Sequence, residues 1–97
     1  MLFSIVCTDK PASLELRTAT RPQHLAYIQG RVSELVLGGP VMDAEGKLCG
    51  SLLVIDVEDR QAAEDFAIGD PYARAGLFES TAIRPFRTVF KDGGQVG

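Results

Sequence analysis

The chain has 97 residues, the size of one domain with a single modest hydrophobic core. Its formal net charge is −3 and its basic residues are scattered, which argues against nucleic-acid binding, because a phosphate backbone selects for clustered lysine and arginine. No segment approaches the ~18 apolar residues of a membrane span, and the opening residues lack a basic leader, so we expect a cytoplasmic protein that binds no membrane.

The first part of the chain predicts a strand followed by a helix. Residues 2–8 (LFSIVCT) are short, apolar and rich in β-branched side chains, as in a strand. Residues 9–20 form a polar connection in which Ser13 can start one helical turn. The first helix is predicted to begin near Pro22, because proline is favoured at the first helical position, and to run to about Ser33.

Two strands joined by a hairpin loop come next. Residues 35–42 read as a strand, and the Gly-Gly-Pro sequence at 38–40 indicates a bulge or an edge position, although it could also let a ligand approach the backbone. Residues 43–47 form the loop, where Gly46 supplies a positive φ. Residues 48–57 (LCGSLLVIDV) are the strongest strand candidate in the chain.

The last part of the chain predicts a helix, a short turn and a final strand. The helix covers residues 59–69 and ends at a glycine, as helices commonly do. A short turn over 70–76 separates it from the last strand, at 80–90. We expect residues 1–90 to form the single domain and residues 91–97 to be a flexible tail.

This order of elements is that of a ferredoxin-like α+β domain, in which two helices cover one face of a four-stranded antiparallel sheet. The strand at 48–57 is apolar on both faces, although an antiparallel sheet with one wet face should alternate apolar and polar residues. We therefore expect a homodimer that packs the uncovered faces of two sheets together. One side of this strand carries Cys49, Ser51, Leu53 and Ile55, and the other carries Leu48, Leu52 and Val54.

His24 is the only histidine of the chain. It lies at the border of an apolar helical stripe formed by Leu25, Ile28 and Val32. A packing role, a metal ligand and a proton-transfer group are the three alternatives. A metal site is disfavoured because no second histidine exists and neither cysteine has ligand spacing, and we expect no cofactor. An imidazole titrates near ~6.5, which suits acid/base work at neutral pH.

Asp70 is the carboxylate that could orient such a histidine. It continues the apolar face of the second helix at the point where that helix ends, so a charge there must find a hydrogen-bond donor. Its alternative role is to cap the short turn that starts at Pro71. The residues alone favour the cap.

Other polar residues give weaker signals. Arg17 and Arg21 flank the approach to His24 and could hold an anionic group, although charged residues most often serve surface solubility. Ser51 lies on a buried strand without the surroundings of a nucleophile, which favours a packed hydroxyl. Cys7 and Cys49 lie in apolar runs and are expected as buried thiols, with a disulfide or redox pair as the alternative.

Several short motifs stand out along the chain: SLELR at 13–17, RPQHLAYI at 21–28, GGP at 38–40, DPYARAGLFE at 70–79 and IRPF at 83–86. Together they resemble the YciI-like family of the dimeric α/β-barrel superfamily. The resemblance implies a ferredoxin-like fold that dimerises through its sheets. It also implies a His–Asp pair in a cleft, which would be His24 and Asp70.

Reactions known in this superfamily move a proton next to a carbonyl or phenol, and one relative is thought to eliminate chloride from a chlorinated hydroxyquinol. The resemblance therefore implies a lyase or isomerase that acts on a small cyclic or aromatic oxygenated molecule without a cofactor. His24 and Asp70 would be its catalytic residues, and Arg17, Arg21, Ser51 and Tyr72 would bind the substrate. The alternative is a non-catalytic dimeric module that binds a small molecule or serves an accessory role.

Overall fold

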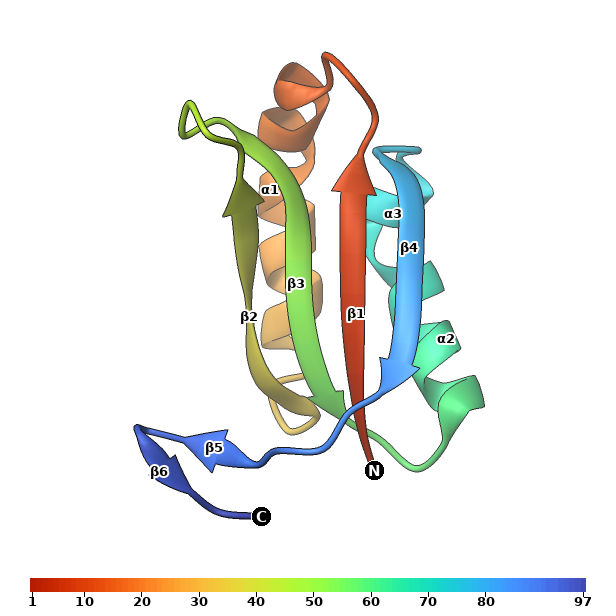
Figure 1. Cartoon of the computed structure of the whole chain (residues 1–97). Coiled ribbons are helices and arrows are strands. Elements are labelled where there is room, and N and C mark those ends of the chain that lie inside the picture. The colour runs from red at the N-terminus through yellow and green to blue at the C-terminus, as the bar shows by residue number, and fades with distance from the viewer.

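The computed structural model describes all 97 residues. Four strands form one antiparallel sheet in the order β2-β3-β1-β4, and the helices lie together behind it (Figure 1). The predicted ferredoxin-like α+β fold is therefore confirmed. None of the helices has the length and apolar character to cross a membrane. The elements of the domain are β1 (Leu2–Asp9), α1 (Leu14–Gln29), β2 (Leu35–Met42), β3 (Leu48–Asp56), α2 (Arg60–Gly69), α3 (Pro71–Arg74) and β4 (Phe78–Pro85).

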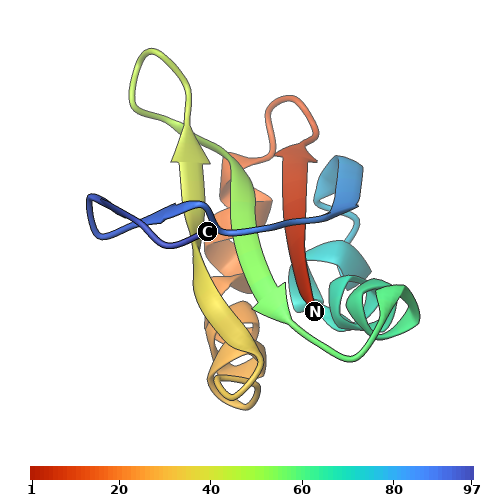
Figure 2. The same ribbon diagram turned by 60° about the horizontal axis from the view of Figure 1, so that its bottom comes forward.

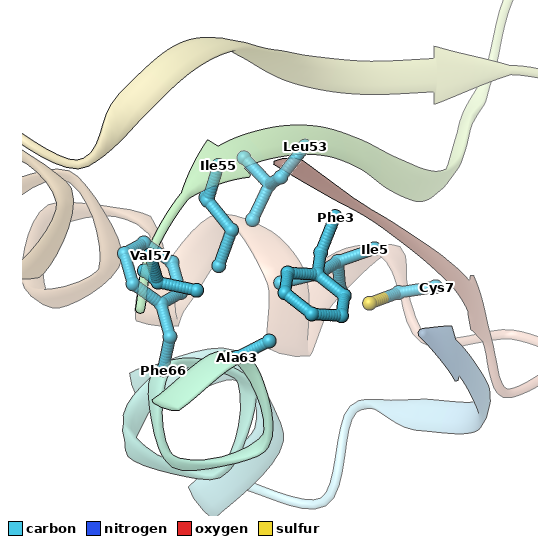
Figure 3. Packing of buried hydrophobic residues seen from close by; sticks show 8 residues of the cluster. All are labelled: Phe3, Ile5, Cys7, Leu53, Ile55, Val57, Ala63 and Phe66. Atoms are coloured by element: carbon cyan, nitrogen blue, oxygen red, sulfur yellow. The ribbon is translucent and has the colours of Figure 1, made fainter. Parts of the chain in front are cut away.

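The hydrophobic core lies between α2 and the central strands β1 and β3 (Figure 3). Side chains of a strand alternate between its faces, so every second residue of β1 and β3 points toward the helices. α1 adds only partly buried residues, Tyr27 and Ile28. The α2 half of the domain is thus well packed, whereas the α1 half is not. The core cluster consists of Phe3, Ile5, Cys7, Leu53, Ile55, Val57, Ala63 and Phe66.

The predicted start of the first helix is wrong. α1 begins at Leu14, and Pro22 lies inside it rather than at its first position. Arg17 in the first turn binds Asp9 at the end of β1, which fixes that turn against the sheet. This tertiary contact outweighs the loss of one backbone hydrogen bond at the proline.

The predicted end of that helix is also too late. α1 ends at Gln29, and residues 30–34 form a turn that leads into β2. Val32, assigned above to the apolar stripe of the helix, therefore lies outside the helix and is exposed. Leu25 and Ile28 remain on the side of α1 that faces the sheet, where they line a cavity.

The C-terminal region differs from its prediction as well. β4 ends at Pro85, which has no N–H to donate to a neighbouring strand. A separate hairpin of β5 (Phe90–Lys91) and β6 (Gly94–Gln95) follows where the sequence predicts the end of a strand and a frayed tail. The tip of this hairpin lies past the edge strand β2 in two views of the molecule (Figures 1 and 2).

Candidate functional site

A cavity of about 250 Å³ lies between α1 and the β2–β3 side of the sheet. A cavity of ~150 Å³ is large enough for benzene, so this one has room for a substituted six-membered ring. Every predicted site residue except Asp70 contributes to its wall. The polar part of the wall is formed by Arg17, Arg21, His24, Ser51 and Tyr72, and the apolar part by Leu25, Ile28, Leu35, Pro40, Leu48 and Leu53.

His24 lines this cavity, and Asp70 lies directly behind it in contact with its ring. His24 Nδ1 is 2.8 Å from Asp70 Oδ1, and the two side chains are only 13% and 5% exposed. An ionised carboxylate only accepts hydrogen bonds, so the proton is on Nδ1, and this N–H donates a hydrogen bond to Asp70 Oδ1. Nε2 is then the basic nitrogen, and it has no partner within the chain.

Asp70 contacts His24 and also caps α3. The same Oδ1 atom that faces His24 also accepts a hydrogen bond of 2.9 Å from the backbone N–H of Tyr72, as the N-cap of α3. The cap fixes the side-chain rotamer of Asp70. The carboxylate therefore reaches His24 in one defined orientation.

The contact between α1 and α2 brings His24 and Asp70 together. Tyr27 Oη of α1 donates a hydrogen bond of 2.9 Å to the backbone carbonyl of Phe66, and the two rings pack edge to face. A Cβ atom on Gly69 would lie 2.6 Å from Tyr27 Oη, so the close approach requires glycine. The glycine that ends α2 as predicted thus serves helix packing, and Asp70 follows it directly.

Tyr72 connects the histidine to the rest of the site. Its ring stacks on the His24 ring with centroids 4.1 Å apart and planes 18° apart. The Arg17 guanidinium lies 4.6 Å from the centre of the same ring, in cation–π range. Burial raises the pKa of Tyr72 and outweighs the opposing effect of Arg17 and Arg21, so the phenol keeps its proton at neutral pH.

Arg17 is buried rather than at the surface. It is 2% exposed, and its Nε and Nη2 atoms bind the two carboxylate oxygens of Asp9 at 2.7 and 2.8 Å. Burial lowers the pKa of Arg17, but the hydrogen bonds and charge of Asp9 outweigh that effect and raise it. Because Asp9 already neutralises this charge, Arg21 is the better candidate for an anion anchor: it lines the cavity, is exposed and forms no ion pair within the chain.

The Gly-Gly-Pro sequence at 38–40 forms part of the cavity wall on β2. β2 is an edge strand, as predicted, and register shifts occur on both sides of this sequence. A Cβ atom on Gly38 would overlap the end of the Leu53 side chain, so the glycine leaves room for that leucine. The irregular edge strand is therefore confirmed, whereas the approach of a ligand to this backbone stays a prediction.

No group of three or more His, Cys, Asp or Glu residues is arranged to hold a metal ion. Cys7 and Cys49 are both free thiols, the first buried and the second half-buried. Burial raises the pKa of Cys7 to about 11, so its thiol stays protonated and unreactive at neutral pH.

Asp9 is the site residue that the interpretation of the sequence missed. It is buried and holds Arg17 at the cavity. The signal was present in the alternation of β1, because Phe3, Ile5, Cys7 and Asp9 all point to the helix-covered face. A carboxylate on a buried strand face requires a donor, and Arg17 is that donor.

Comparisons with known proteins agree with this fold. TftG of Burkholderia phenoliruptrix, a 5-chloro-2-hydroxyhydroquinone dehydrochlorinase solved in complex with 2,5-dihydroxybenzoquinone, superposes with a TM-score of 0.85 at 32% identity, over 90% of this chain and 94% of that one. The protein Rv0793 of Mycobacterium tuberculosis, at 13% identity and a TM-score of 0.51, shares the fold over 95% of this chain and 99% of that one.

Relatives are also found by sequence. Protein YciI of Escherichia coli is 36% identical and an uncharacterised protein of Haemophilus influenzae is 37% identical, each over 93% of this chain and 100% of the relative. The family model of the YCII-related domain matches residues 1–87. The chain is therefore a member of the YCII-related family.

Proposed function

We propose that the chain is a cofactor-independent enzyme of the lyase or isomerase type that moves a proton on a small cyclic or aromatic oxygenated molecule. His24 is its general acid/base, and Asp70 fixes the tautomer of the imidazole. The observation that carries this proposal is the 2.8 Å contact from Nδ1 to Asp70 Oδ1, which leaves Nε2 free in a ring that lines the cavity. A base held in this way by a carboxylate is a recurring arrangement in proton-transfer catalysis.

The reaction follows from the chemistry of the pair. Nε2 takes a proton from a hydroxyl group, or from a carbon next to a carbonyl, and the imidazolium that forms is stabilised by the adjacent Asp70 carboxylate. The electron pair left behind spreads through the conjugated ring. It takes the proton back at a ring carbon, which makes the enzyme an isomerase. Where that carbon carries a halide, a second proton transfer from a ring hydroxyl to Nε2 then expels the halide, which makes the enzyme a lyase.

The walls of the cavity support a flat oxygenated substrate. Leu25, Ile28 and Leu53 offer apolar contacts, while Arg21 offers an unpaired positive charge for an acidic oxygen. The structural neighbour TftG binds 2,5-dihydroxybenzoquinone, a ring of this type. We therefore propose hydroxylated benzene rings and quinones as the substrate class.

Turnover assays on purified protein test this function. Wild type is incubated with 5-chloro-2-hydroxyhydroquinone and with chlorine-free hydroxyquinols, and chloride release and quinone absorbance are followed. Activity on any of these that is lost in His24→Gln and lowered in Asp70→Asn supports the proposal. Binding without turnover would instead support the alternative of a non-catalytic binding or accessory module.

We also propose a homodimer that forms through the uncovered face of the sheet. Neighbouring strands present exposed apolar side chains there, with Leu52 of β3 directly opposite Val6 of β1. Leu37 and Val41 of β2 extend this patch toward the sheet edge. Contiguous exposed apolar surface is typical of a protein interface, and a second copy supplies a surface of matching character.

Sedimentation of two matched variants tests the dimer. Leu52 on the open sheet face and Leu16 on α1 are each 38% exposed. Replacing either residue by aspartate therefore removes a similar amount of buried apolar surface. Leu52→Asp is expected to sediment as a monomer, and Leu16→Asp as a dimer like wild type. A wild type that sediments as a monomer at micromolar concentration would contradict the proposal.

The state of the two cysteines indicates the cellular compartment of the protein. Both are free thiols, and such thiols are typical of a reducing compartment. We therefore propose that the protein resides in the cytoplasm, which fractionation of the source cells would test.

A further inference from the structure

Ser51 is a cavity residue whose hydroxyl proton is unused within the chain. Arg17 Nη2 donates a hydrogen bond of 2.9 Å to Ser51 Oγ, and Ser51 is 4% exposed. A guanidinium has donors only, so the serine oxygen must be the acceptor in this contact. No residue of the chain accepts a hydrogen bond from Ser51 in return. Its proton is therefore available to a molecule in the cavity, whose wall includes Ser51.

The Asp9–Arg17 pair fixes the orientation of this hydroxyl. Two hydrogen bonds of 2.7 and 2.8 Å hold the guanidinium against Asp9, and the two side chains are buried. A guanidinium held by two hydrogen bonds cannot rotate freely. The lone pair of Ser51 Oγ that accepts a hydrogen bond from it is therefore also fixed in direction. A cationic donor on the oxygen polarises the O–H bond and strengthens it as a donor.

We infer that Ser51 forms an oxygen-binding subsite, in which its hydroxyl donates a hydrogen bond to a carbonyl or phenolate oxygen of the ring that loses its proton to His24. This inference rests on the proposed function and narrows its substrate class to conjugated rings with at least two oxygen substituents. His24 comes from α1 and Ser51 from β3, so they approach a ligand from different walls of the cavity.

The Ser51 subsite stabilises the charge that develops when His24 removes the proton. When Nε2 takes the proton, the electron pair moves through the ring and negative charge builds on the second oxygen. A donor held in place for that oxygen stabilises the charge as it develops. Arg17 and Asp9 act as positioning residues through Ser51.

Binding of 2,5-dihydroxybenzoquinone, followed by calorimetry and infrared spectroscopy, tests the subsite. A hydrogen bond from Ser51 lowers the stretching frequency of the bound carbonyl, and this shift is expected in wild type and in the control Ser80→Ala, whose serine is exposed on β4. Ser51→Ala is expected to lose the shift and to bind the quinone ~10-fold more weakly, the size of one hydrogen bond.

Two further variants keep the test decisive. Ser51→Cys retains the size of the side chain but offers a weak S–H donor, so its carbonyl band is expected to move toward that of the free quinone. His24→Gln is expected to keep the shift of the quinone carbonyl band while losing turnover in the hydroxyquinol assays above. This variant separates the subsite from the proton-transfer step. Wild-type band positions in both Ser51 variants would overturn the subsite and leave the proposed function standing. Failure of wild type to bind the quinone would overturn both.

Discussion

The helix-covered face of the sheet has two ends with opposite character. At one end, Phe3 and Ile5 of β1 and Ile55 of β3 pack against α2 without any polar partner. At the other end, the same two strands present Asp9 and Ser51, and α1 meets them with charged and polar side chains. One pair of strands thus supplies both the core and the candidate site.

The difference lies in what each helix presents to the sheet. Phe66 of α2 fills the space above the sheet, whereas α1 leaves a cavity of about 250 Å³ beside Arg17 and His24. Buried polar groups at the cavity end are held by partners, and the groups left free include the Arg21 guanidinium, a basic nitrogen on His24 and a hydroxyl proton on Ser51. Changes at the core end should therefore cost stability, and changes at the cavity end should cost activity.

The largest expected effect is at the cavity end. Removing a general base typically lowers the rate ~10²–10⁴-fold, so His24→Gln should nearly abolish turnover while the melting temperature stays close to wild type. The adjacent, exposed Gln23 supplies the control variant Gln23→Ala, which should keep wild-type kinetics. A His24→Gln protein that melts lower and yet turns over at the wild-type rate would make this histidine a packing residue.

The converse experiment is at the core end. Phe66 is fully buried, and truncation of such a ring to alanine costs about 3–5 kcal/mol of unfolding free energy. Urea denaturation of Phe66→Ala should show this loss. Its kcat at a temperature where it remains folded should stay within a few-fold of wild type, and a selective loss of activity with unchanged stability would reverse the roles of the two ends.

The buried Asp9–Arg17 pair belongs to the cavity end, yet its loss should cost stability, because both side chains are buried. Arg17→Met leaves Asp9 as a buried unpaired carboxylate, which costs roughly 3 kcal/mol of unfolding free energy. Replacing both partners, in Asp9→Leu with Arg17→Met, should recover most of that loss, because no buried charge is left. Equal stability of the single and double variants in urea denaturation would show that the pair carries no such coupling.

The smallest expected effect is a pH dependence at Cys7, the β1 residue between Ile5 and Asp9. Burial raises the pKa of its thiol from 9.0 to about 11 in the folded state. The unfolded state therefore loses this proton first, and the stability contributed by the protonated thiol is full below pH ~9 and is lost as the pH rises toward ~11. Denaturation across this range should show a fall that is smaller in Cys7→Ala, and identical slopes for the two proteins would contradict it.

Much of the core end could be predicted from the sequence, because it depends on local patterns. The apolar alternation of β1 and β3 and the glycine at position 69 predicted the strands and the end of α2 close to where they lie. The same patterns failed for α1, where a proline suited to a helix start lies in the interior. The Asp9–Arg17 contact that begins this helix joins two elements, and no single stretch of sequence reveals it.

The candidate site was predictable in its residue types and not in its contacts. The His24–Asp70 pairing came from a family resemblance, since spacing alone left Asp70 as a cap, and both roles turn out to share one oxygen atom. Arg17 could not be separated from Arg21 by sequence, because their difference is burial. In the proposed function, that difference assigns a positioning role to Arg17 and the role of ligand anchor to Arg21.

The most direct test of proton transfer uses the fact that His24 is the only histidine. Nitrogen-15 NMR of labelled protein reports the protonation of both ring nitrogens without ambiguity. When the imidazole is neutral and no ligand is bound, Nδ1 should be protonated and Nε2 should not, as the contact with Asp70 requires. 2,5-Dihydroxybenzoquinone has acidic hydroxyls and is an anion at neutral pH, so it mimics the ring that has lost its proton, and on its addition Nε2 should take up a proton. A ligand that binds in the cavity while Nε2 stays unprotonated, or a free protein with the proton on Nε2, would contradict the role of His24 as the base.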